Sequence, residues 1–117
     1  MNVEAITDET MKYLSMSKYI TQLEVLNVAN CSITDEGIKA LCNSANFQKL
    51  IDLDISNDNR DFDLNTITDA SLDYLANSTY LTNLEKLNLR GLRVSSNGIN
   101  MISISYNFMN LSTLRLS

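Results

Sequence analysis

The sequence contains no histidine, and this absence removes several classes of active site. The Ser-His-Asp triad and the Cys-His pair both depend on an imidazole as the general base. The two cysteines, Cys31 and Cys42, are too few for a disulfide framework, and without histidine they cannot complete a zinc site. We therefore expect two buried thiols and no bound metal.

Glycine is also scarce, because only Gly37, Gly91 and Gly98 occur and each stands alone. A phosphate-binding loop needs clustered glycines, so we expect no cofactor of the nucleotide type or of any other type. Carboxylate pairs do occur, but they lie where helices are expected to start, and there the helix dipole already stabilises negative charge. The sequence therefore predicts a protein that is not an enzyme and has no catalytic residues.

Positive charge and long apolar runs are limited as well. The net charge of −5 argues against a nucleic-acid partner, because a phosphate-binding face needs clustered Lys and Arg. No segment approaches the roughly 18 apolar residues of a membrane span, and no secretory signal is visible, so we expect a cytoplasmic protein with no membrane partner. The 117 residues, 44% hydrophobic, predict a single domain, 1–117, with a buried core.

An internal repeat organises the whole chain. The segment ITDETMKYL, which begins at Ile6, recurs in related form at Ile33, Ile67 and Val94, with spacings of 27, 34 and 27 residues. Each copy precedes a segment of the pattern LxxLxL. Seven columns are apolar in all four copies, and in the first copy they hold Ile6, Met11, Leu14, Ile20, Leu23, Leu26 and Val28. The repeat therefore predicts units at about 6–28, 33–55, 67–89 and 94–116, with an insertion at 57–65.

Each unit reads as a helix followed by a short strand. The apolar spacing in the first half is that of one helix face, and the alternation in LxxLxL directs one strand face inward. Hydroxyl residues stand where they can cap the helices, and acidic residues follow them. A column of small residues predicts close packing of each helix against its neighbours. The hydroxyl column is Thr7, Thr34, Thr68 and Ser95, and the small column is Thr10, Gly37, Ser71 and Gly98.

The strand segments resemble the leucine-rich repeat signature, LxxLxLxx(N/C)xL, which Leu23 to Ile33 fits in full with Cys31 at the Asn/Cys position. The units are similar to the ribonuclease-inhibitor-like and cysteine-containing subclasses, and CSITDEGIKAL is similar to strings in F-box leucine-rich-repeat proteins. Asp58 and Leu92 depart from the signature, and no F-box segment is present. The resemblance implies an α/β fold, a right-handed solenoid of four helix-strand units with a parallel sheet on the concave face and helices on the convex face.

In this family partners bind the concave face or its loops, so the outward strand residues are the first candidate site. In register, Asp52 would neighbour Lys86, while Asp54, Asn88 and Arg115 would form one row. We predict a surface for a protein or peptide of mixed charge. The alternative is ordinary cross-strand pairing that keeps an open sheet in solution. The candidate residues are Asn27, Asp52, Asp54, Lys86, Asn88, Arg90 and Arg115.

The insertion is the second candidate site, because loops carry binding residues more often than the scaffold does. We predict partner contacts from Asp58, Arg60 and Phe62, with Phe62 as an apolar anchor among charges. The alternative is a solvated loop. Calcium binding is disfavoured, because the five nearby aspartates lack the spacing, the central glycine and the terminal glutamate of an EF-hand.

The last strand, LSTLRL, is followed by no further repeat in the sequence and would leave an open sheet edge. Such an edge predicts either a longer repeat protein or a second copy or subunit that covers it. Two functions therefore remain open. The first is a recognition or scaffold module, and the second is an assembly subunit or homo-oligomer joined through the terminal strand.

Overall fold

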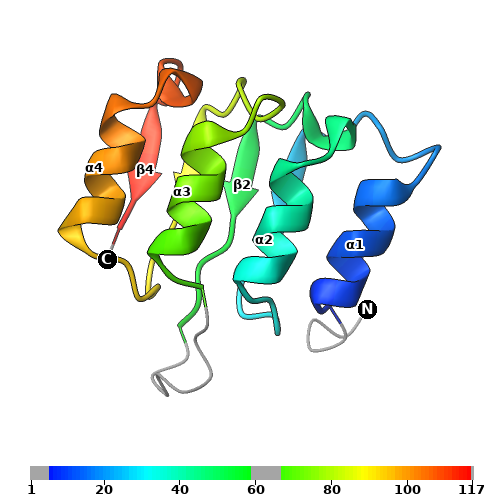
Figure 1. Ribbon diagram of the computed structural model, residues 1–117, viewed down its shortest axis with the longest axis horizontal. Helices are drawn as coiled ribbons and strands as arrows, with labels where there is room; N and C mark the ends of the chain where they lie inside the picture. Colours follow the sequence, from blue (N-terminus) through cyan, green and yellow to red (C-terminus); the bar gives the residue numbers. More distant parts are fainter. Residues whose placement is uncertain (1–5, 59–66, 117) are drawn as a thin grey trace.

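The computed structural model describes residues 6–58 and 67–116. Within them each unit contains a helix and then a strand, and the helices lie side by side in one layer against the strands (Figure 1). Units two and four also contain a short 3-10 helix. The elements are α1 (Asp8–Met16), β1 (Val25–Asn27), α2 (Asp35–Cys42), η2 (Ala45–Phe47), β2 (Asp52–Asp54), α3 (Asp69–Asn77), β3 (Lys86–Asn88), α4 (Ser96–Ile104), η4 (Tyr106–Phe108) and β4 (Thr113–Arg115).

The strands form one parallel sheet in the order β1-β2-β3-β4, so neighbours in sequence are neighbours in space. Leu26, Leu53, Leu87 and Leu114 are paired in succession across the sheet. This register confirms the predicted alignment of the repeat, and the helix-strand alternation with a single parallel sheet confirms the predicted α/β solenoid class.

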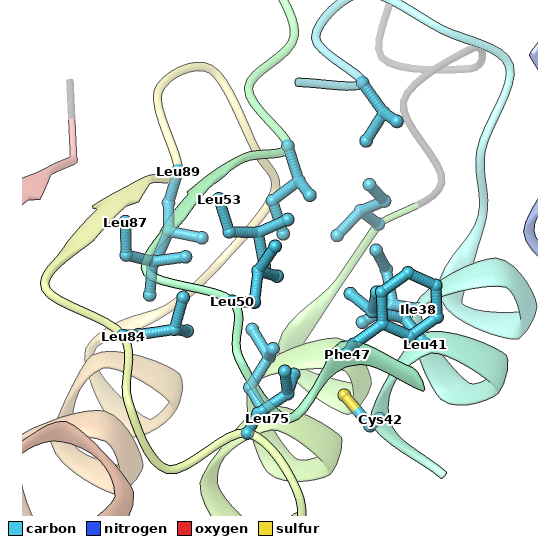
Figure 2. Packing of buried hydrophobic residues seen from close by; sticks show 14 of the residues in the cluster. Ile38, Leu41, Cys42, Phe47, Leu50, Leu53, Leu75, Leu84, Leu87 and Leu89 are labelled. Atoms are coloured by element: carbon cyan, nitrogen blue, oxygen red, sulfur yellow. The ribbon is translucent and has the colours of Figure 1, made fainter. Parts of the chain in front are cut away.

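The core lies between the sheet and the helices. Leu53 and Leu87 from the sheet pack with Phe47 and Leu84, and all are buried (Figure 2). Burial of one such side chain stabilises the fold by roughly 1.5–3 kcal/mol. The outer strands lack a neighbour on one side, so Leu26 is only half-buried and Leu114 remains 36% exposed. Stacking of units therefore provides the cover that one unit lacks.

The hydroxyl column caps only some helices in the predicted way. The Thr34 side chain accepts a hydrogen bond from the Glu36 nitrogen at 3.1 Å, and Thr68 accepts one from the Ala70 nitrogen at 3.3 Å. Ser95 makes no such cap, although its hydroxyl donates to the Asp69 carboxylate as the Thr34 and Thr68 hydroxyls do to Asp8 and Asp35. The prediction was thus wrong at Ser95 and right at Thr34 and Thr68.

Aspartates at the helix starts join one unit to the next. Asp8 Oδ1 accepts from the Thr34 nitrogen at 2.9 Å, and Asp8 Oδ2 accepts from Thr34 Oγ1 at 2.5 Å. Asp35 binds Thr68 in the same way, and Asp69 binds Ser95. We call this arrangement the aspartate clamp. The helix dipole, which the sequence suggests as the reason for these acids, is therefore only part of their role, because their hydrogen-bond partners lie one unit away.

The clamp also explains the column of small residues. A Cβ atom on Gly37 would overlap Asp8 Oδ1, and one on Gly98 would overlap Asp69 Oδ1. In the third unit Ser71 Oγ donates to Asp35 Oδ1 at 2.5 Å. The predicted close packing is therefore confirmed, with a carboxylate of the preceding unit as the group that requires the space.

Candidate functional site

The helices leave one face of the sheet uncovered, which we call the open sheet face. It carries the first and third residue of each strand, since the middle leucines point into the core. A cleft of about 440 Å³ lies on this face over β2, β3 and β4. Its lining residues are Asp52, Asp54, Lys86, Leu87, Asn88, Thr113 and Arg115. Five predicted residues thus share one cleft, while Asn27 and Arg90 are not among its lining residues.

Some of these side chains form hydrogen bonds that stabilise the turns after the strands. Asp54 Oδ1 accepts from the Ser56 nitrogen at 3.0 Å and from Ser56 Oγ at 2.6 Å, and Asp54 Oδ2 accepts from Asn88 Nδ2 at 3.3 Å. Asn27 and Asn88 accept in the same way from the backbone two residues on. Such local bonds shape turns. The sequence analysis missed this structural role of the row.

Three charged side chains in the cleft are not engaged in this way. Within residues 6–58 and 67–116, Asp52, Lys86 and Arg115 form neither a side-chain hydrogen bond nor an ion pair. Asp52 and Lys86 are paired in register, yet no ion pair joins them in this part of the chain. Lys86 and Arg115 are exposed and Asp52 is half-exposed. The cleft therefore presents charges that a bound molecule can reach.

The charges of the cleft are separated by strand. Asp52 and Asp54 belong to β2, whereas Lys86 and Arg115 belong to β3 and β4. Arg90, which follows β3 and is exposed, extends the basic half. The cleft therefore has an acidic side at β2 and a basic side at β3–β4.

At the rim of the sheet only the beginning of the second candidate site is described. The Asp58 nitrogen donates to Asn30 Oδ1 at 2.7 Å, and the Asp58 side chain is exposed. Asn30 has a φ of 58°, so it occupies the left-handed region and turns the chain after β1. Arg60 and Phe62 lie outside the described residues.

A family model described as Leucine Rich repeat matches residues 20–42. The matched segment contains β1, the turn at Asn30 and α2. The match supports a leucine-rich repeat protein. The search of curated proteins gave no match. Leucine-rich repeat families are typically non-catalytic and generally mediate protein–protein interaction. The ribonuclease-inhibitor-like and F-box-associated subclasses stay predictions.

The fourth unit presents a second cleft, of about 550 Å³, at the C-terminal end of the stack. Ile104, Tyr106 and Met109 line it, and they are 75%, 79% and 64% exposed. The sequence analysis predicted an open edge at β4 but missed these three residues. The column of Ile104 holds Met16, Asn43 and Asn77 in the preceding units, so it contains both apolar and polar residues and gave no consistent signal.

The prediction of two buried thiols is right for Cys42 and wrong for Cys31, which is only half-buried. Burial raises the pKa of the Cys42 thiol to about 12, and burial also raises the pKa of Cys31. A thiol is a nucleophile only as the thiolate, so Cys42 is inert near neutral pH. Among the described residues no group of three His, Cys, Asp or Glu side chains could hold a metal, and no helix is long and apolar enough to cross a membrane.

Proposed function

We propose that the chain is a non-catalytic recognition module that binds a protein or peptide partner across the open sheet face and the adjoining rim. The observation that carries this proposal is the cleft in which Asp52, Lys86 and Arg115 lie together without partners among the described residues. The general role of leucine-rich repeats in protein–protein interaction supports it.

The chemistry of the cleft favours a polypeptide over other ligands. The lining mixes carboxylates, basic groups and the amide of Asn88, which is the mixture found in polar parts of protein interfaces. A nucleic acid is disfavoured, because Asp52 and Asp54 would repel phosphates next to Lys86. Small-molecule pockets are mostly apolar and enclosing, which this cleft is not.

Site-specific photo-crosslinking tests the proposal. A photoreactive amino acid replaces Thr113, which lines the cleft and is exposed, and in a matched control it replaces Lys12, which is exposed on α1. In the cells that make the protein, we expect a discrete adduct with a different protein from position 113 and none from position 12. An adduct of position 113 with a second copy of the chain alone would contradict the proposal, because Thr113 also lines the cleft at the C-terminal end. The same adducts from both positions, or adducts from position 12 alone, would contradict a site on the open sheet face.

A second function is favoured by the apolar cleft at the C-terminal end. There every residue of β4 is exposed, together with Ile104, Tyr106 and Met109. Ser96 stands in the column of Asp8, Asp35 and Asp69, so this end lacks the carboxylate with which each described unit clamps the next. A second copy joined β4 to β4 would cover the exposed strand without needing such a carboxylate.

Light scattering over a concentration series tests this second function. A dimer should form and should dissociate when Ile104 and Met109 are both replaced by Asp, because those side chains are exposed in the single chain and would be buried between copies. A monomer at about millimolar concentration would exclude assembly through β4 and would leave the recognition function standing.

A further inference from the structure

The geometry points to a specific partner chemistry, and this inference rests on the proposed function. We infer that the cleft binds an extended segment of a protein that carries a carboxylate over β3–β4 and a cation over β2. The carboxylate lies between Lys86 and Arg115, and the cation meets Asp52. Asp54 is hydrogen-bonded within the fold, whereas Asp52, Lys86 and Arg115 form no side-chain hydrogen bond or ion pair among the described residues.

Lys86 and Arg115 form the carboxylate site. They lie on adjacent strands and, through the pairing of Asn88 with Arg115, are displaced by two residues along the strand direction. With strands about 4.8 Å apart and a rise of about 3.3 Å per residue, their Cα atoms are separated by roughly 8 Å. Both side chains are long and exposed, so their heads can converge on one carboxylate. The guanidinium of Arg115 can bind it in the two-pronged manner typical of arginine.

Asp52 forms the cation site. It lies directly across from Lys86 on β2 and has no hydrogen-bond partner in the described part of the chain. Asp54 is different, because its oxygens already accept from Ser56 and Asn88. Asp54 therefore adds negative charge near the cation, but its oxygens already accept hydrogen bonds within the fold.

The spacing of the two sites defines the segment that fits. They are one to two strand spacings apart, about 5–10 Å. In an extended peptide, residues i and i+2 point to the same side and lie about 7 Å apart. A peptide that crosses the strands with an acidic and a basic residue two positions apart therefore places one charge over each site.

The experiment uses labelled nine-residue peptides in a Ser/Gly background and measures binding by fluorescence anisotropy at low salt. The probes carry Lys-Ser-Glu, Glu-Ser-Lys, Gln-Ser-Glu, Lys-Ser-Gln or Gln-Ser-Gln at the centre. We expect one of the two doubly charged peptides to bind most tightly, and replacement of its Glu to weaken binding more than replacement of its Lys. Added salt should weaken binding further.

Charge reversal on the protein provides the matched comparison. Lys86→Glu with Arg115→Glu should lower affinity for the best peptide by about tenfold or more. Lys12→Glu with Lys18→Glu makes the same change in net charge at exposed positions on and just after α1, and should change affinity by less than about twofold. This comparison separates a local carboxylate site from a general effect of net charge.

Failure of this inference can be told apart from failure of the proposed function. Equal binding of the charged and the Gln-Ser-Gln peptides, no effect of the Lys86 and Arg115 reversals, or no binding of any probe would overturn the charge assignment. If position 113 still crosslinks a different protein, recognition at the open sheet face stands without it. If position 113 gives no such adduct either, both are rejected.

Discussion

Asp35, at the start of α2, binds Thr68, at the start of α3, through both carboxylate oxygens. Oδ1 lies 2.8 Å from the Thr68 nitrogen, and Oδ2 lies 2.7 Å from Thr68 Oγ1. The two residues are 33 positions apart, whereas the corresponding pairs at the other two junctions are 26 apart. The middle junction thus keeps its clamp across the insertion.

Asp35→Ala should lower the free energy of unfolding by about 2–4 kcal/mol, because hydrogen bonds to a charged group are worth about 1.5–3 kcal/mol each and are not additive. Three donors lose their acceptor: the Thr68 nitrogen, Thr68 Oγ1 and Ser71 Oγ. Urea denaturation followed by circular dichroism measures the change. Asp58→Ala, at an exposed carboxylate, should stay within about 0.5 kcal/mol of the parent. Equal losses in both variants would show that the clamp does not stabilise the junction.

Gly37→Ala should destabilise the protein by about 1–3 kcal/mol through overpacking. In an ordinary helix interior the same change stabilises by up to about 1 kcal/mol. The sign reverses here because the new Cβ would overlap the Asp8 carboxylate. Gly98→Ala should behave alike against Asp69. The thermal midpoint provides the readout, and a rise in it for either variant would contradict the packing described.

The Tyr80→Asn variant should be more stable than the Tyr80→Ala variant by about 1 kcal/mol, the net contribution of a typical hydrogen bond. Asn107 Nδ2 donates to the carbonyls of Leu75 and Ser78 at the end of α3, and Asn46 does the same for α1. Tyr80 occupies this column in the third repeat and has the same bond from its nitrogen to the preceding serine. Tyr80→Ala controls for removal of the ring, so the gain is the difference between the Asn and Ala variants.

Acid should weaken the last junction through Asp69. Hydrogen bonds from the Ser95 side chain and backbone lower the pKa of Asp69 below its ordinary value of 3.8. Because the pKa of Asp69 is lower in the folded than in the unfolded state, its ionised carboxylate contributes to the stability of the fold. This contribution is complete above pH 3.8 and is lost as the pH falls through the folded-state pKa. Asp69→Asn should therefore flatten the dependence of stability on pH in this acid range. Denaturation curves recorded from pH 5 to 2, about two units around 3.8, measure this dependence. If stability falls with acid as steeply in Asp69→Asn as in the parent protein, the clamp is contradicted.

The fold could be predicted because its main determinant repeats in the sequence. Columns such as that of Leu26, Leu53, Leu87 and Leu114 reveal the strand register directly, and the structure pairs these residues as expected. The aspartate clamp could not be found in the same way. Within one unit the helix dipole accounts for the acids, while their hydrogen-bond partners lie in the next unit.

The candidate site was predictable in outline. Register placed Asp52 beside Lys86 and Asn88 beside Arg115, and the structure has both pairs. The turn-forming role of Asp54 was missed because a carboxylate on a strand reads equally well as a contact group. Its signal was the recurrence of Asn27, Asp54 and Asn88 at the third strand position. Whether a charged side chain in the cleft is hydrogen-bonded within the fold depends on its neighbours in space. A single sequence does not reveal those neighbours.

The clamp has a consequence for how such an array can change in length. Each junction is formed by an acidic residue in one unit and a hydroxyl residue in the next, as in Asp8 with Thr34 and Asp69 with Ser95. A tandem duplication of any of the first three units would carry both the acidic and the hydroxyl residue and would form the same junction again. Duplication of the fourth unit would place Ser96 at the position where the other units have the acidic residue. Duplication of whole units therefore preserves the junction chemistry for the first three units and interrupts it at the fourth.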